Sequence, residues 1–160
     1  MASPQPSPQP SPLLRLHALD EEDLRLLSAC LQDALLRVGD MAYIPAKQRF
    51  ALIADRFDWT TEASSGGFER ARAGVHFETV RNARFKGVPR DYPALALELL
   101  TITFEPAQAP GGRLLLNFAG GGAISLEVDC IEAQLCDMGP RWRVSSCPAH
   151  ALDEGLGSSS

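Results

Sequence analysis

The chain has no apolar run of the length that crosses a membrane as a helix, which takes about 20 residues. Candidates such as LALELLTITF contain a charge and have the pattern of a strand. The segment MASPQPSPQPSP has neither a basic start nor an apolar centre, so it lacks the pattern of a secretory signal. We therefore expect a cytoplasmic protein that makes no membrane contact.

Paired cysteine spacing is also missing. The four cysteines, Cys30, Cys130, Cys136 and Cys147, form no C-x-x-C motif of the kind that binds zinc or carries out redox chemistry. Cys147 and His150 are spaced C-x-x-H, which is half of a metal site, but no second pair matches it. The sequence thus predicts reduced structural thiols, with no metal and no cofactor.

Signatures of catalysis are scarce as well. A catalytic serine or cysteine needs a base and an orienting acid beside it, and the chain has three histidines, His17, His76 and His150. The first two fall on the outer faces of expected strands, and no G-x-S-x-G motif is present. We predict no catalytic residues and favour a non-enzymatic binding or adapter module that acts through protein contacts.

The most motif-like stretch, RLLLNFAGGGAISLEV, has three glycines between two apolar runs. A glycine loop that binds phosphate is followed directly by a helix, whose free backbone N–H groups face the anion. Here apolar residues alternate with polar ones on both sides of the glycines, which is typical of strands. The stretch therefore predicts a β-hairpin with glycine at the turn.

One helix is expected near the N-terminus, over residues 21–36. Asp20 is suited to cap it, and three acidic residues follow where they favour the helix dipole. Apolar residues at spacings of three and four predict one buried face: Leu24, Leu27, Leu31 and Leu35. A second, short helix is expected over residues 130–138, because Asp129 and Glu132 have the spacing of a capping box.

Alternating patterns between and beside these helices predict strands. They cover Leu14 to Ala18, the segments MAYIP and RFALIADRF around a turn at 45–48, the run from Ala71 to Phe85 with a break near Val80, and LALELLTITFE. Short connections favour antiparallel pairing. We expect an α+β fold: a mostly antiparallel meander of six to seven strands, as a rolled sheet or partial barrel. This single domain should span residues 13–150, between disordered tails at 1–12 and 151–160.

Basic residues gather between Arg70 and Arg90, where six of them face one acid, Glu78, in a chain of net charge −5. This basic strand (70–90) is either a solvated strand face, the alternative that we favour, or a surface for an anionic partner. Nucleic acid is not favoured, because the aromatic residues of the segment point inward. Self-association through the acidic segment Asp20–Asp23 is a further alternative. The candidate surface consists of Arg70, Arg72, Arg84 and Lys86.

One polar and aromatic cluster, DRFDW, lies at the end of an expected strand, where binding sites are often built. It gives the rival hypothesis of a small enzyme or ligand-binding protein with a site near Asp55, Asp58 and Trp59. A salt bridge that stabilises the turn under a packed tryptophan is the simpler interpretation.

The order of these segments resembles an alphaproteobacterial family called domain of unknown function 2948. The resemblance rests on LQDAL-x-x-VGD, on RFDW and on GGGAI-x-LEV-x-CIEA-x-L-x-D-x-GP, and it extends from Leu14 to His150. It implies a small bacterial cytoplasmic protein and no particular activity.

Overall fold

The computed structural model describes residues 13–58, 68–139 and 142–144. Trp59, His150, Cys147 and both expected tails lie outside these residues. Within them the chain forms one α-helix, two short 3-10 helices and eleven strands. The elements are β1 (Arg15–Ala18), α1 (Glu21–Cys30), β2 (Ala34–Arg37), η1 (Val38–Asp40), β3 (Met41–Ile44), η2 (Pro45–Lys47), β4 (Arg49–Asp58), β5 (Phe68–Phe77), β6 (Val80–Lys86), β7 (Ala96–Pro106), β8 (Gly112–Phe118), β9 (Ala123–Val128), β10 (Ala133–Asp137) and β11 (Trp142–Val144).

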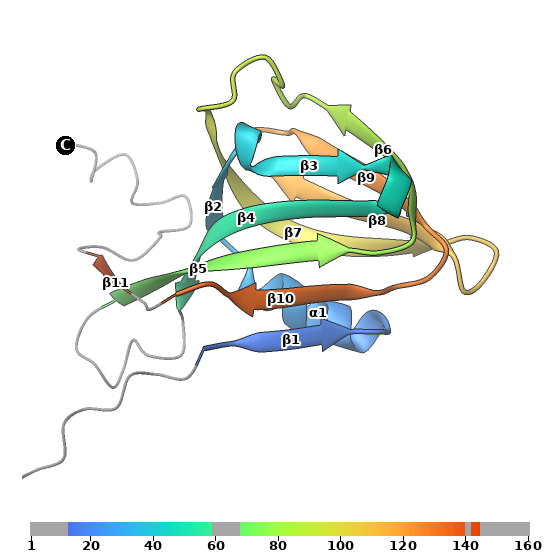
Figure 1. The fold of residues 1–160 in the computed structure, drawn as a ribbon, viewed down its shortest axis with the longest axis horizontal. Helices are drawn as coiled ribbons and strands as arrows, with labels where there is room; N and C mark the ends of the chain where they lie inside the picture. Colours follow the sequence, from blue (N-terminus) through green and yellow to red (C-terminus); the bar gives the residue numbers. More distant parts are fainter. Residues whose placement is uncertain (1–12, 59–67, 140–141, 145–160) are drawn as a thin grey trace, which may run out of the picture.

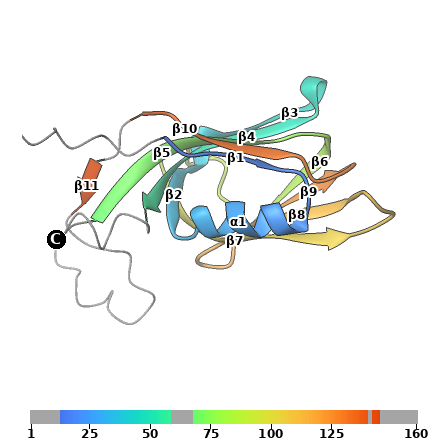
Figure 2. The same cartoon turned by 90° about the horizontal axis from the view of Figure 1, so that it is seen from below.

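The described strands form one antiparallel sheet in the order β1-β10-β5-β4-β2-β7-β8-β9-β6, with β3 also paired to β4 and β11 to β5. The sheet curves over, so that β1, β10, β5 and β4 form one layer opposite β7 and β8 (Figures 1 and 2). The two ends of this order do not pair with each other. The expected antiparallel α+β fold is confirmed, but the expected number of six to seven strands is wrong. Consecutive strands form two meanders, β3–β4–β5 and β7–β8–β9, and the other described strands pair with partners distant in the sequence.

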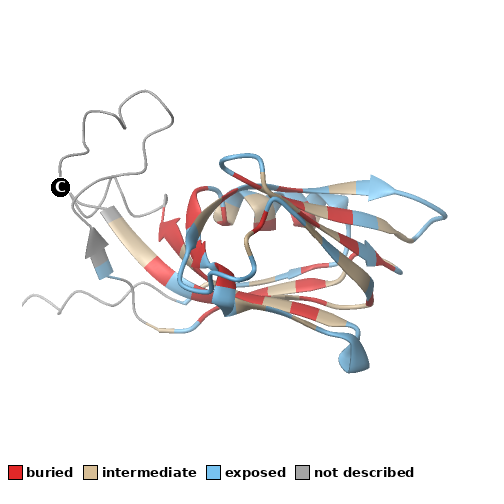
Figure 3. Ribbon diagram, turned by 90° about the horizontal axis from the view of Figure 1, so that it is seen from above, coloured by how far each residue is buried: buried red, intermediate tan, exposed pale blue. Residues whose placement is uncertain are grey.

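The core lies between the two layers, where the inward-facing residues of each strand are buried (Figure 3). The alternation is clear on β4, whose even-numbered residues are buried, and on β5, whose odd-numbered residues are. Burial of each large apolar side chain contributes about 1.5–3 kcal/mol. The largest fully buried side chains include Phe50, Phe57, Phe77, Leu27, Leu114, Leu116, Ile124 and Leu126.

The N-terminal helix is shorter than expected. Asp20 caps it as predicted, by accepting a hydrogen bond from the backbone of Asp23. It ends at Cys30, and Asp33 then adopts a left-handed φ of 65°, which no helix tolerates. The chain continues as β2, which pairs with β7. Leu35 is therefore 39% exposed on a strand and is not the fourth buried leucine of a helix. Pairing with β7 outweighs helix propensity here.

The expected helix at 130–138 is also wrong, because residues 133–137 form β10. This strand lies between β1 and β5 and buries Ala133, Leu135 and Asp137 on one face. The period of two was present in the sequence, but the charge of Asp137 concealed it. Pairing of this segment with the distant strands β1 and β5 outweighs the local preference for a helix that the capping-box spacing indicates.

The other expected strands are present, and their bounds differ from the expected ones by at most three residues. The glycine stretch forms the β8–β9 hairpin, with Gly120 and Gly121 at φ values of 91° and 98°. The long basic run is broken at Thr79, whose φ of 57° turns the chain from β5 into β6. The start of β6 is tied to the β3–β4 hairpin, because Val80 N–H donates to the carbonyl of Gln48 (2.8 Å) and Tyr43 Oη donates to the carbonyl of Val80 (3.0 Å).

Candidate functional site

A groove on the outer face of the sheet collects residues from β2, β4 and β5. β2 pairs with β4 at a single position, Leu35 opposite Asp55. After β2 the chain turns away from the edge of β4 through η1, and it returns as β3 farther along the same edge. This detour leaves a cavity of about 510 Å³, which we call the outer groove.

The lining of the outer groove combines apolar and charged side chains. The apolar part includes Leu35, Ile53 and Met138, of which Leu35 and Met138 are 39% and 57% exposed. The charged part holds both signs: Arg37, Asp40, Asp55 and Arg72.

Asp55 and Arg72 face each other across β4 and β5, and they form a two-pronged ion pair. Arg72 Nε donates to Asp55 Oδ1 at 2.9 Å, and Nη2 donates to Oδ2 at 3.3 Å. This hydrogen bond, together with the charges of Asp55 and Asp40, raises the pKa of Arg72 above its ordinary value. The pair remains open to water, so it adds at most about 1 kcal/mol to stability, and both groups are accessible to a partner.

The two acids of the DRFDW segment lie on opposite faces of β4. Asp55 faces outward into the outer groove, whereas Asp58 is 1% exposed. They are three positions apart on one strand, and a strand alternates faces at every residue, so they cannot share a side. Trp59 is outside the described residues. The structure therefore places Asp55 beside Arg72 and not beside Asp58.

The four basic residues of the candidate surface are divided between two strands that do not pair with each other. On β5, Arg70 Nη1 donates to the carbonyl of Asp55 (3.0 Å) and its guanidinium lies 5.7 Å from the ring centre of Phe57, while Arg72 pairs with Asp55. On β6, Arg84 and Lys86 form no ion pair with any described residue. Two of the four residues of the candidate surface are thus engaged within the protein, and Arg84 and Lys86 are without an ion pair among the described residues.

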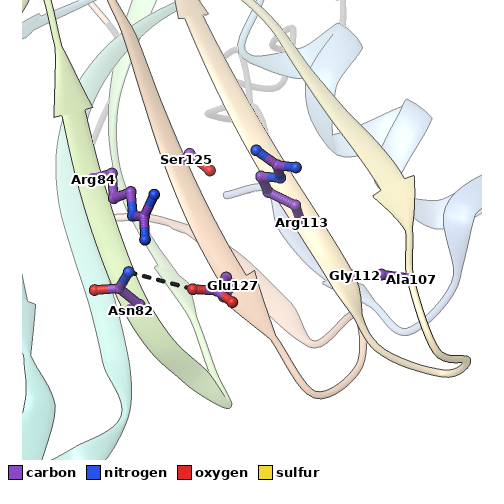
Figure 4. A pocket seen from close by; sticks show the side chains of 7 residues that line it. All are labelled: Asn82, Arg84, Ala107, Gly112, Arg113, Ser125 and Glu127. Atoms are coloured by element: carbon purple, nitrogen blue, oxygen red, sulfur yellow. Dashed lines mark hydrogen bonds between the residues drawn. The ribbon is translucent and has the colours of Figure 1, made fainter.

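A shallow depression lies around Arg84, on the outer face of β6, β9 and β8, with a volume of about 230 Å³. Figure 4 shows Arg84 and Arg113 on either side of Ser125, with Glu127 below them. Asn82 Nδ2 donates to Glu127 Oε2 at 3.3 Å. Arg113 and Ser125, which the sequence did not single out, are brought to Arg84 by strand register.

The interior holds a polar cluster that the sequence did not predict. Arg56 forms a two-pronged ion pair with Asp137, and their side chains are 5% and 0% exposed. Burial lowers the pKa of Arg56, but the hydrogen bond and charge of Asp137 outweigh it and the pKa is raised. Burial raises the pKa of the nearby Cys30 thiol; Arg56 opposes this, while Asp137 and Asp58 add to it. Alternation along residues 131–137 was the signal that pointed Asp137 inward.

The remaining expected features concern metals, histidines and membranes. Residues 13–58, 68–139 and 142–144 contain no group of three metal-binding side chains. His76 on β5 lies between Glu78 (2.6 Å), in the turn after β5, and Gln134 (3.1 Å), on the neighbouring strand β10. Among the helices that the structure describes, none has the length and apolarity needed to span a membrane.

Residues 14–150 match the family described as "Protein of unknown function (DUF2948)". The chain belongs to this family. The match begins just before β1 and continues beyond β11, so every described element of the DUF2948 chain falls within it. No curated protein and no solved structure matches the chain. Any account of what this DUF2948 protein does therefore starts from its own surface.

Proposed function

We propose that this protein is a non-enzymatic binding module and that the outer groove receives a segment of another protein. The observation that carries the proposal is the composition of the groove, in which exposed apolar side chains adjoin charges of both signs. Protein interfaces commonly have an apolar centre with a polar rim. The expected location, the bacterial cytoplasm, stays a prediction.

The side chains of the outer groove indicate which kind of partner segment would bind there. An apolar side chain of the partner would rest on Leu35, Ile53 and Met138, and so remove their exposed surface from water. A charge beside it would meet the Asp55–Arg72 pair. Because this pair is exposed, a partner can add hydrogen bonds to it without first breaking a buried interaction.

The rival hypothesis is a small enzyme or a small-ligand site near Asp55. The described lining of the groove holds no histidine, cysteine or serine, so it lacks the Ser–His and Cys–His pairs of the common covalent mechanisms, and the carboxylate of Asp55 is paired with Arg72. In a binding role, the charged side chains of the groove would all be available to contact the partner. For this reason we prefer the protein partner.

Photo-crosslinking tests this proposal. A photoreactive amino acid at position 35 should join the full chain to a partner protein in cells, and the substitution Met138→Glu should abolish that product. The same photoreactive residue at Leu26, which is 57% exposed on α1, serves as the control. Equal products from positions 35 and 26, or a product that survives both Met138→Glu and Arg72→Glu, would contradict the proposal. A small molecule retained by the wild type in native mass spectrometry and lost in Asp55→Asn would favour the rival.

A second candidate, an anionic partner at the basic strand, is favoured by the open pair Arg84 and Lys86. Ser125 on β9 adds a hydroxyl beside Arg84, and Arg113 on β8 adds a second guanidinium, which also pairs with Glu105 at 3.6 Å. Titration with inorganic phosphate, followed by the amide shift of Ser125, should show binding that weakens with salt. If the shifts in Arg84→Gln equal those in the wild type, this candidate fails.

A further inference from the structure

Strand β7 has a free edge. On one side it pairs with β8 from Leu99 to Pro106, but on the other side β2 covers only Ala96 to Leu99. From Leu100 to Pro106, no strand of the described residues pairs with this side. The helix α1 lies alongside it instead (Figure 2).

The direction of the backbone groups follows from two hydrogen bonds. At the hairpin end, Ala107 N–H donates to the carbonyl of Gly111 (3.0 Å). The backbone N–H and C=O groups of odd-numbered β7 residues in this part of the strand therefore point toward β8. Ile102 N–H points the other way and donates to Ser28 Oγ at 2.9 Å. By the same alternation, the N–H and C=O of Phe104 face the free edge. No described residue pairs with them there.

Both ends of the free edge are protected from pairing with another strand, so only a few backbone groups between them can pair. Ser28 already satisfies Ile102 N–H. The next residue of the edge after Phe104 is Pro106, which has no N–H to offer. Side-chain caps and prolines are usual means of keeping an edge from pairing at random. The unprotected window between them comprises the C=O of Ile102 and both backbone groups of Phe104.

A groove adjoins this window. A cavity of about 310 Å³ lies between α1 and β7. It is lined by Arg25, Ser28 and Ala29 of α1, which follow a helical spacing, and by Gln32 just after the helix ends. On the strand side it is lined by Leu100, Thr101, Ile102 and Thr103. Leu100 is 39% exposed. Arg25 is the one charged group of this lining.

We propose that a short extended segment of another protein adds to the free edge of β7 and places an apolar side chain in the α1–β7 groove. Unpaired backbone groups in a row require an extended partner, because a strand presents matching N–H and C=O groups. The charge of Arg25 selects a segment with an acidic group near its apolar residue. A second copy of the chain would bring its own α1 to the same edge, so a lone strand fits the window better. This site is separate from the outer groove.

The test uses a phage-displayed library of random nine-residue peptides, panned against the full chain. Selected peptides should share an apolar residue next to an acidic one. They should bind the Ala29→Glu variant about tenfold or more weakly, because a carboxylate then enters the groove. Leu26→Glu, on the same helix but outside the groove lining, is the matched control and should bind as the wild type does. In Arg25→Glu the panel should select basic peptides.

Hydrogen exchange of the Phe104 amide provides the second readout. It should be fast in the free protein and protected in the peptide complex, whereas Ile102 should be protected in both. The proposal is overturned if panning enriches no peptide, if Ala29→Glu binds as tightly as Leu26→Glu, or if the Phe104 amide is unchanged by peptide. It is equally overturned if sedimentation shows a dimer that protects Phe104, since the edge then belongs to a second copy. Met138→Glu should leave peptide binding intact, which separates this site from the outer groove.

Discussion

Arg56 and Asp137 meet across an intervening strand. Arg56 lies on β4 and Asp137 on β10, with β5 between them, yet Nε reaches Oδ1 at 2.9 Å and Nη2 reaches Oδ2 at 2.7 Å. The β5 residues in register with them are Ala71 and Ala73, both fully buried. Their small side chains leave the space through which the ion pair forms.

We expect single substitutions in this pair to be strongly destabilising. Arg56→Met leaves a buried carboxylate without its guanidinium, which costs about 3–5 kcal/mol. The double variant Arg56→Met/Asp137→Leu should lose much less than the two single losses combined. Urea unfolding measures each value. The exposed pair Arg72 and Asp55 is the control, where Arg72→Met should cost about 1 kcal/mol or less. Additive losses at Arg56 and Asp137 would show that the pair is not coupled.

Ser28 should stabilise the fold through one hydrogen bond. Ser28→Ala leaves the Ile102 N–H without its acceptor in a mostly buried position, so we expect a loss of about 1–3 kcal/mol. Exchange of the Ile102 amide should accelerate in this variant. Ser28→Thr retains a hydroxyl and should keep most of the protection. An unchanged Ile102 exchange rate in Ser28→Ala would argue against this bond.

The β8–β9 turn provides a test of backbone conformation alone. An added Cβ would touch nothing within 4 Å at either Gly121 or Gly139, but only Gly121 has a positive φ, of 98°. Gly121→Ala should therefore lower the free energy of unfolding by about 1–2 kcal/mol, and Gly139→Ala should change it little. Thermal or urea unfolding of the two variants decides. Equal losses at both positions would contradict the explanation.

The Cys30 thiol should make stability depend on pH in the alkaline range. Burial raises its pKa in the folded protein, so the unfolded chain loses this proton first as the pH rises. The thiol's contribution is complete below the unfolded pKa, about 8.5, and is lost as the pH rises through the folded value. Urea midpoints at pH 7.5 and pH 9.5 should fall more in the wild type than in Cys30→Ala. Parallel falls in both proteins would dismiss Cys30 as the source.

Local patterns in the sequence predicted the elements whose pairing is local. The β3–β4 and β8–β9 hairpins followed from alternation and turn residues, and the break near Val80 followed from the change in phase. The errors fall where distant strands decide. β2 pairs with β7 and β10 pairs with β1 and β5, so helical patterns at those positions gave way to contacts that no local window contains.

The candidate sites show the same division. Arg72 and Asp55 could each be singled out from the sequence, but their contact depends on the β4–β5 register. The sequence did not identify Asp137 as a buried ion-pair partner, because the capping-box spacing predicts a helix over residues 130–138. The free edge of β7 arises from the difference in length between β2 and β7, which only the assembled sheet reveals.

The position of β10 has a consequence for biosynthesis. Among the described strands, β10 is the one neighbour of β1, and it also covers an edge of β5. Asp137 also binds the backbone just before β1, because its Oδ2 accepts a hydrogen bond from Leu14 N–H at 2.8 Å. A nascent chain therefore cannot complete this layer until residues near Asp137 have left the ribosome. Contacts between such distant segments slow folding, so the newly made chain exposes a strand edge that chaperones can bind until β10 has been synthesised.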